Sequence, residues 1–184
     1  MPLKVALKIL DARLPGWGFP HYGSPLAAGL DLHACLDTPL LVRPQAPAAL
    51  ISAGFAFRID DPEWCALVLP RSGLGHNEGL VLGNAVGLID ADYEGACLVS
   101  AWNRNPPRSR ADDPDAGIVI RPGDRIAQLV FTRIARPEFA VVAEFAGGGG
   151  RQEGGFGSTG IAAAARPVQR LVESGQDGET HGSS

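Results

Sequence analysis

The sequence predicts an all-β fold, and three observations carry that prediction. Short apolar runs recur along most of the chain. Proline, glycine and aspartate separate these runs at close spacing, and the chain holds 24 glycines and 15 prolines. No stretch before residue 160 has the long 3.6-residue apolar period of a helix. Many short strands with turn residues between them are typical of a β-barrel or a β-sandwich.

The expected strands are the apolar runs that turn residues bound, taken in chain order. An alternating apolar strand, Ala28–Leu32, holds Asp31. The other runs are residues 5–10, 40–42, 49–59, 64–69, 80–82, 96–102, 117–120, 126–134 and 139–145. Residues 84–98 are expected to form a hairpin whose turn lies near Asp90–Gly95. One short helix is expected at Ser72–Glu78, after a turn in which Ser72 can act as the N-cap.

The composition changes along the chain and indicates three segments. Residues 1–146 carry the apolar runs and are expected to form the β-domain. Residues 147–160 begin with a run of four glycines and are expected to form a glycine-rich arm. Residues 161–184 are rich in alanine, glycine and serine, and we expect a disordered tail in which only 162–172 have helical character. Within the β-domain, residues 106–117 read as a polar, proline-rich loop.

Composition and charge narrow the class of protein. Hydrophobic residues make up 45% and charged residues 20% of the 184 residues, which is ordinary for a soluble globular protein. The net charge of −4 argues against a general binder of nucleic acid or of a membrane surface. The sequence shows no apolar run of membrane-spanning length and no signal peptide. Cys35, Cys65 and Cys97 lie far apart in apolar runs, so we expect reduced thiols in a cytoplasmic protein and no metal site made from them.

The most informative stretch is Arg151–Gly160 in the glycine-rich arm. Arg151 offers a forked donor that fits a phosphate, and Phe156 offers a flat face that can stack on a base. Gly157, Ser158 and Thr159 offer backbone and hydroxyl donors that can approach phosphate oxygens closely. This combination is typical of a mobile arm that closes over a ligand, although composition alone leaves a plain flexible linker equally open.

Four further clusters can carry chemistry, and each alone also has an ordinary structural explanation. The turn Arg71–Gly73 can bind phosphate or be a simple capped turn. Asp90 can orient a water as a general base or be a turn aspartate. Asp31 can hold a hard cation through water or pair with an arginine. Tyr93 can pack against a sugar, and Gln128 can donate to a phosphate, but each can also be a packing or edge residue.

Taken together and in this order, the clusters resemble the five motifs of the trimeric dUTPase (deoxyuridine triphosphatase) family. This sequence reads AGLDL, PRSGLG, GLIDADYEG, GDRIAQL and RQEGGFGSTG, and the resemblance covers residues 5–160. It implies a distorted, jelly-roll-like β-barrel with one short helix and a mobile C-terminal arm. It also implies a cytoplasmic homotrimer with shared active sites that uses Mg²⁺ to hydrolyse dUTP to dUMP and pyrophosphate. That reaction keeps uracil out of DNA and supplies dUMP for dTMP synthesis.

The resemblance also implies a role for each matched residue. Asp90 is the catalytic residue that orients a water toward the α-phosphorus, and Tyr93 leaves no room for a 2′-hydroxyl. Asp31 is linked through water to the Mg²⁺ that the triphosphate chelates. Arg151 binds the γ-phosphate, and Phe156 stacks on the uracil. The other substrate-binding residues are Arg71, Ser72, Gly73 and Gln128 at the phosphates, Asn84, Gly87, Leu88, Ile89 and Leu98 around the uracil, and Gly157, Ser158 and Thr159 in the arm.

Some positions depart from the family pattern, and two other functions compete with this one. Gln152 stands where the family usually has glycine, and the loop 106–117 is longer than expected. A deoxycytidine triphosphate deaminase on the same fold would need a glutamate at the base, and Glu94 is the nearest acid. A ligand-sensing or interaction protein on this fold should have lost the catalytic aspartate or the arm, and both are present. His33 and His76 have no metal-ligand partner at suitable spacing and are taken as non-catalytic.

Overall fold

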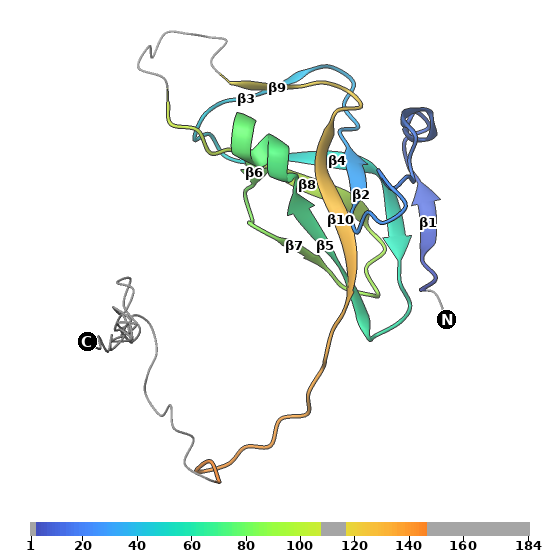
Figure 1. The fold of residues 1–184 in the computed structure, drawn as a ribbon, viewed down its shortest axis with the longest axis vertical. Helices are drawn as coiled ribbons and strands as arrows, with labels where there is room; N and C mark the ends of the chain where they lie inside the picture. The colour runs from blue at the N-terminus through green and yellow to red at the C-terminus, as the bar shows by residue number, and fades with distance from the viewer. Residues whose placement is uncertain (1–2, 108–116, 147–184) are drawn as a thin grey trace, which may run out of the picture. The chain divides into compact units, whose positions relative to one another are not determined.

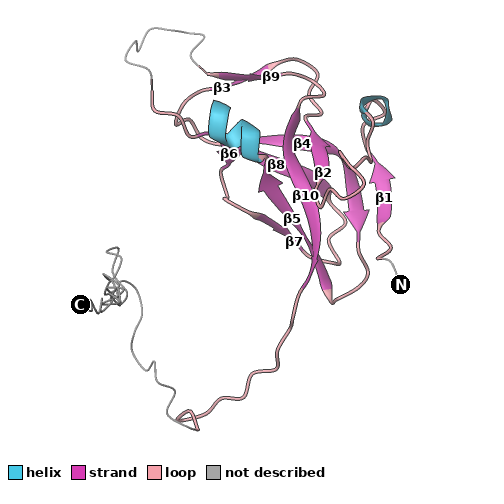
Figure 2. Ribbon diagram, viewed as in Figure 1, coloured by secondary structure: helices cyan, strands magenta, loops and turns pink. Residues whose placement is uncertain are grey.

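The structure is a computed structural model that describes residues 3–107 and 117–146. Within these ranges the chain is almost entirely strand and loop, which confirms the all-β prediction (Figures 1 and 2). The chain divides into two units, Met1–Glu138 and Phe139–Ser184, and every described strand belongs to the first. No helix among the described residues is long and apolar enough to cross a membrane.

The described strands form three antiparallel sheets. The first sheet has the order β1 (Ala6–Ile9), β4 (Ala49–Arg58), β8 (Ala96–Asn103), β6 (Leu80–Leu82). The second has the order β2 (Leu30–His33), β10 (Arg125–Arg133), β5 (Trp64–Pro70), β7 (Gly87–Ile89). The third pairs β3 (Leu40–Val42) with β9 (Ile118–Ile120).

The core lies between the two larger sheets, because alternate residues of each strand point inward. In β8, Cys97, Val99 and Ala101 are buried while Leu98 is exposed. The buried amide of Asn103 donates from Nδ2 to the carbonyl of Val42 at 3.0 Å and so fastens β3 to the end of β8.

Aromatic rings join the first sheet to the second. Phe55 and Phe57 lie in β4, and their ring centroids are 5.9 Å apart. Phe57 meets Phe131 of β10 edge-on at 5.7 Å, and Phe55 meets Phe19 at 4.5 Å. These contacts favour one continuous core beneath both sheets.

The one short helix follows β5 at the expected place. Residues 72–78 are helical, and their last part, Leu74–Glu78, is a π-helical turn. Gly79 ends the helix with a φ of 79°, a left-handed conformation that glycine adopts without strain. The helix prediction is therefore confirmed, but Ser72 is itself the first helical residue rather than the residue before it, so the capping role suggested for Ser72 is wrong. A 3₁₀ turn at Leu14–Trp17 was not expected.

Two other predicted elements are wrong. Residues 139–145 form no strand, and Phe139, Val141 and Phe145 are 88%, 100% and 92% exposed. A strand needs a partner for its backbone ladder, and the described residues give this segment none. Residues 84–98 do not form a hairpin, because β7 pairs with β5 whereas β8 pairs with β4 and β6. The turn Asp90–Gly95 instead carries the chain from one sheet to the other.

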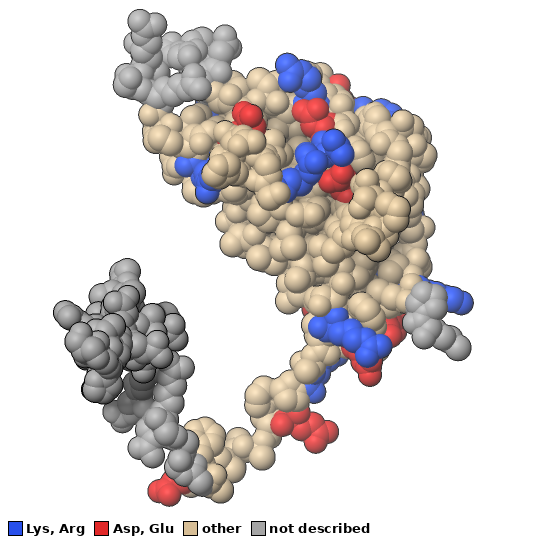
Figure 3. Space-filling model, viewed as in Figure 1, with Lys and Arg blue, Asp and Glu red and all other residues tan. Residues whose placement is uncertain are grey.

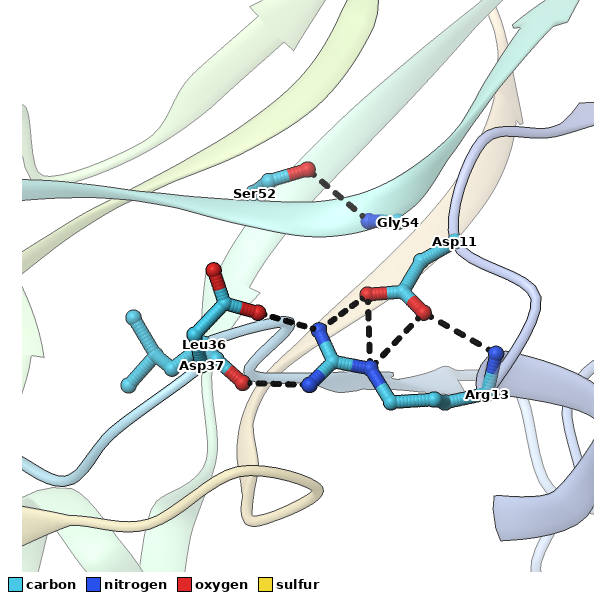
Figure 4. A network of polar contacts seen from close by, with 6 residues as sticks. All are labelled: Asp11, Arg13, Leu36, Asp37, Ser52 and Gly54. Carbon is cyan, nitrogen blue, oxygen red and sulfur yellow. Dashed lines mark hydrogen bonds and ion pairs between the residues drawn. The ribbon is translucent and has the colours of Figure 1, made fainter.

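A polar network fastens the segment that follows β1 (Figure 4). The Arg13 guanidinium donates two hydrogen bonds to the Asp11 carboxylate, from Nη2 at 2.6 Å and from Nε at 2.9 Å. Its Nη1 donates to the carbonyl of Leu36 at 2.9 Å, in the loop after β2. The hydrogen bonds from Arg13 lower the pKa of Asp11 to about 2. The charged pair therefore ties two segments that are distant in sequence.

Candidate active site

The second sheet brings the expected phosphate-binding residues together. Strand β10 lies between β2 and β5, and its register sets Gln128 opposite Asp31 on one side and Leu69 on the other. The Gln128 amide donates from Nε2 to the carbonyl of Pro70 at 3.0 Å. A cavity of about 280 Å³ opens at this end of the sheet. Its lining residues are Gly23, Ala27, Gly29, Asp31, Arg71, Ser72, Gly73, Leu74 and Gln128.

Asp31 lies between two arginine side chains at the wall of this cavity. Arg71 Nε is 3.0 Å from one carboxylate oxygen, and Arg125 Nη1 is 3.0 Å from the other. Two guanidinium groups against one carboxylate leave a net positive charge, which suits an anion such as phosphate. Sequence reasoning did not single out Arg125, although the residue stands inside the GDRIAQL motif and its charge was the available signal.

A second cavity, of about 760 Å³, shares Asp31 and Arg71 with the first. His33 lies in its wall, is 7% exposed, and its Nδ1 has no hydrogen-bond partner among the described residues. Burial lowers the pKa of His33, with further lowering from Arg125 and Arg71 against an opposing effect of Asp31. His33 thus lines the wall beside the carboxylate, where burial disfavours its charged form.

The residues expected around the base and the sugar lie at the other edge of the second sheet. Gly87 starts β7, and a Cβ at this position would come within 3.1 Å of the Val68 Cβ, so a larger residue would force Val68 in β5 to shift slightly. Asn84 lies in the preceding turn, where Ala85 has a φ of 61°. The side chain of Leu88 in β7 is 64% exposed.

The catalytic candidate Asp90 directly follows β7. It is exposed and lines a cavity of about 430 Å³ together with Arg58, Asp60 and Trp64. Tyr93 is 43% exposed and donates its hydroxyl to the carbonyl of Ala96 at 3.2 Å. Glu94, the acid weighed for a deaminase, is ion-paired with Arg58. The aspartate and the tyrosine therefore share one exposed turn.

A single chain does not bring the two groups of residues together. Ile89 pairs with Ala66 near the start of β5, whereas Arg71 follows the last residue of the same strand. The strand rise puts Asp90 and Arg71 about 20 Å apart along β5. The residues expected around the uracil are themselves divided, because Ile89 lies on β7 and Leu98 lies on β8 of the other sheet. The expected arm residues lie outside the described residues: Arg151, Phe156, Gly157, Ser158 and Thr159.

The chain matches one protein family and many curated relatives. The family model described as dUTPase matches residues 16–160. The deoxyuridine 5′-triphosphate nucleotidohydrolase of Methylococcus capsulatus is 51% identical over 158 residues, which are 85% of this chain and 97% of that protein. The protein of the same name from Albidiferax ferrireducens is 48% identical over 158 residues, 86% of this chain and 98% of its own length.

Solved structures give the same picture of the fold. The dUTPase of Staphylococcus bacteriophage 80alpha, solved with dUPNHPP, has a TM-score of 0.68 at 26% identity and covers 86% of this chain and 99% of its own. A variant of the dUTPase from phage phi11 of S. aureus, described with a coordinated structural Mg(II) ion, has a TM-score of 0.64 at 24% identity. The phi11 likeness concerns the fold alone.

Proposed function

Because the chain belongs to the dUTPase family and is a dUTP diphosphatase, we propose that its two groups of residues are the two halves of one active site, shared between subunits. The separation of Asp90 and Arg71 along β5 carries this proposal. Each half alone lacks chemistry that the hydrolysis of dUTP to dUMP and pyrophosphate needs. Among the residues that line the 280 Å³ cavity, the one carboxylate, Asp31, is held by two arginines. Among those that line the 430 Å³ cavity, none forms a counterpart of the Arg71–Gly73 turn.

In the phosphate half, Arg71, Ser72, Gly73 and Gln128 bind the triphosphate. Arg71 contributes a guanidinium that Asp31 already holds in place, and the turn contributes a hydroxyl and backbone N–H groups. The transition state of phosphoryl transfer spreads negative charge over the phosphate oxygens, so preorganised donors at this wall stabilise it.

Mg²⁺ fits this half as an ion that arrives with the substrate. No group of three histidine, cysteine or acidic side chains among the described residues is placed to hold a metal, so the triphosphate supplies most of the ligands. Asp31 is the carboxylate in the wall of the 280 Å³ cavity, and it would hold the hydrated ion through water. When bound, Mg²⁺ neutralises part of the charge on the phosphate oxygens.

In the other half, Asp90 holds the attacking water and accepts its proton, while Tyr93 packs against the deoxyribose. Asn84 and the backbone of Gly87, Leu88, Ile89 and Leu98 bind the uracil edge. The exposure of Asp90, Tyr93 and Leu88 supports this proposal, because a ligand can reach all of them from solvent. Glu94 is held by Arg58 and is not free to activate a water at a base, which argues against deamination.

The subunits are proposed to form a homotrimer. Leu50, which is 71% exposed, and Leu98, which is 44% exposed, lie on neighbouring strands of the first sheet, and such apolar side chains favour burial against another copy. The exposed apolar segment 139–145 also favours burial in an assembly. We further propose that residues 1–146 form the β-domain, that 147–160 form the arm that covers the ligand, and that 161–184 are a tail without a part in the reaction.

The enzyme is proposed to act in the cytoplasm and to bind neither nucleic acid nor membrane. Cys35, Cys65 and Cys97 are free thiols, and burial raises the pKa of Cys97 to about 12, so this thiol stays protonated and unreactive. Basic and acidic side chains lie interspersed on the face drawn in Figure 3, without a continuous basic surface. The net charge of −4 points the same way.

Subunit mixing tests the shared site. Asp90→Asn and Arg71→Ala proteins are each expected to be nearly inactive with dUTP and Mg²⁺. When the two are co-expressed, about one site in four should combine an intact Asp90 from one subunit with an intact Arg71 from a neighbour. Pyrophosphate release should therefore return to a measurable fraction of the wild-type rate.

The matched control is the double variant, Asp90→Asn with Arg71→Ala, co-expressed with Arg71→Ala. No site in that mixture has Arg71, so no activity should return. A first mixture that stays as inactive as this control would show that each site is built within one chain.

A further inference from the structure

We propose that the end of β4, Arg58–Asp60, is a clamp that positions the turn carrying Asp90 and Tyr93, with Arg58 as a positioning residue for the reaction. The inference rests on the proposed roles of Asp90 and Tyr93. It concerns residues outside the five motifs, which sequence reasoning did not single out.

The backbone part of the clamp acts on the residue after Asp90. The N–H groups of Ile59 and Asp60 both donate to the carbonyl of Ala91, at 3.0 Å and 3.3 Å. Asp60 itself has a φ of 63°, a conformation that costs a non-glycine residue free energy. The chain is thus held in a costly conformation at the point where it grips the turn.

The side-chain part acts on the residue after Tyr93. The Arg58 guanidinium pairs through Nε with Asp60 and through Nη1 with Glu94. The guanidinium therefore links Asp60, two residues after the end of β4, to the far side of the same turn. Ala91 and Glu94, the immediate neighbours of Asp90 and Tyr93, are both held by the one tripeptide.

The turn that carries Asp90 and Tyr93 has little packing to hold it apart from the clamp. The cavity of about 430 Å³ lies against Asp90, Ala91 and Asp92, so packing does not fill that side of the turn. Arg58 and Glu94 are 50% and 64% exposed, and exposed ion pairs contribute little to the stability of a fold. We therefore expect the clamp to fix the geometry of the turn rather than to hold the protein folded.

Loss of the clamp should separate kcat from KM. Because the triphosphate binds in the other half of the site, on residues remote from Arg58, the KM for dUTP should change less than kcat does. A small displacement of Asp90 misaligns the attacking water, and displacement of Tyr93 opens room for a 2′-hydroxyl. The expected signature is a lower kcat together with a smaller ratio of kcat/KM between dUTP and UTP.

The test compares Arg58→Gln and Arg58→Lys with a control, Arg43→Gln, in the full chain. Arg58→Gln should lower kcat about 5- to 50-fold and narrow the ratio between dUTP and UTP several-fold, because misplacement near 1 Å can cost about 100-fold. Lysine keeps the charge but lacks the fork, so Arg58→Lys should lie between wild type and Arg58→Gln. Arg43 is exposed and takes part in no ion pair of the described residues, so Arg43→Gln should match wild type.

Melting temperatures and two reference variants decide the outcome. Asp90→Asn and Tyr93→Ala are measured in parallel. If Asp90→Asn turns over dUTP like wild type, or Tyr93→Ala keeps the wild-type ratio of kcat/KM between dUTP and UTP, the proposed role of that residue is wrong, and the clamp is overturned with it. If they behave as expected while Arg58→Gln keeps the wild-type kcat and substrate ratio, the clamp is overturned, whether or not the melting temperature falls. A loss of kcat and of selectivity in Arg58→Gln at an unchanged melting temperature supports it.

Discussion

At the scale of single residues, charge and backbone freedom decide what each side chain of the site can do. Asp31 is ion-paired on both sides, with Arg71 and with Arg125, and in the proposed site these three side chains form an anion-binding wall. Asp90 is exposed on a turn, which leaves its carboxylate able to hold a water. Two aspartates of one chain thus receive different roles from their surroundings.

The role of Asp90 predicts the effect of removing its charge. Asp90→Asn keeps the size of the side chain but cannot accept a proton from the attacking water. General-base catalysis typically contributes about 10²- to 10⁴-fold, so kcat for dUTP should fall by that factor. Binding of a non-hydrolysable dUTP analogue, measured by calorimetry, should stay close to that of wild type. A variant that turns over dUTP like wild type would remove Asp90 from this role.

Gly29 predicts a steric effect on the phosphate half. A Cβ at this position would lie 2.4 Å from Oε1 of Gln128, so Gly29→Ala must push the amide away from Pro70. Because a flexible side-chain end moves easily, the fold should survive while the KM for dUTP rises about 10-fold, the loss of roughly one hydrogen bond to a charged group. Gly16→Ala is the control, since its Cβ would meet nothing within 4 Å. An unchanged KM would show that the Gln128 amide does not contact the phosphates.

At the scale of elements, register and connections place these residues. Strand β10 pairs with β2 on one side and with β5 on the other, and these two pairings bring motifs that are far apart in sequence to one cavity. The network of Asp11 and Arg13 likewise joins distant parts of the chain, because it connects the segment after β1 to the loop after β2 (Figure 4).

That network predicts a pH-dependent contribution to stability. Arg13 depresses the pKa of Asp11 from 3.8 to about 2 in the folded protein, so the ionised carboxylate favours the folded state. The contribution is fully present above pH 3.8 and is lost as the pH falls through about 2. Asp11→Asn should therefore lower the urea midpoint at pH 7 and flatten its fall with pH in that acid range. Asp37→Asn should leave the midpoint unchanged, because Asp37 is 95% exposed and 3.3 Å from Arg13.

At the scale of the whole molecule, the described residues contain both halves of a site but hold them apart. In the proposed shared site, assembly of several copies would bring the two halves together and would also cover apolar side chains such as Leu50. The proposed arm would then close that site over the bound nucleotide.

The arm and the tail are predicted to differ in their effect on activity. Phe156→Ala should lower kcat/KM for dUTP about 5- to 150-fold, since stacking of a base on an aromatic ring contributes about 1–3 kcal/mol. Phe156→Trp should restore much of this, because another flat ring can stack. Deletion of residues 161–184 should cost little in the same assay. A large loss on that deletion with Phe156→Ala silent would show that another segment covers the ligand.

The sequence by itself determined the class of fold, the family and the chemical groups. Motifs such as PRSGLG and GLIDADYEG place reactive side chains on turns beside strands, and short-range spacing is enough to recognise them. The helix at 72–78 was also predictable, because its signals lie within a few residues.

Only the tertiary structure decided which strands pair and which residues meet. The hairpin expected at 84–98 and the strand expected at 139–145 failed because backbone ladders depend on partners that are remote in sequence. The same reason explains why Arg125 beside Asp31, and Arg58 beside Glu94, were not foreseen. An ion pair between distant residues follows from strand register and sheet order, and the local spacing of residues predicts neither.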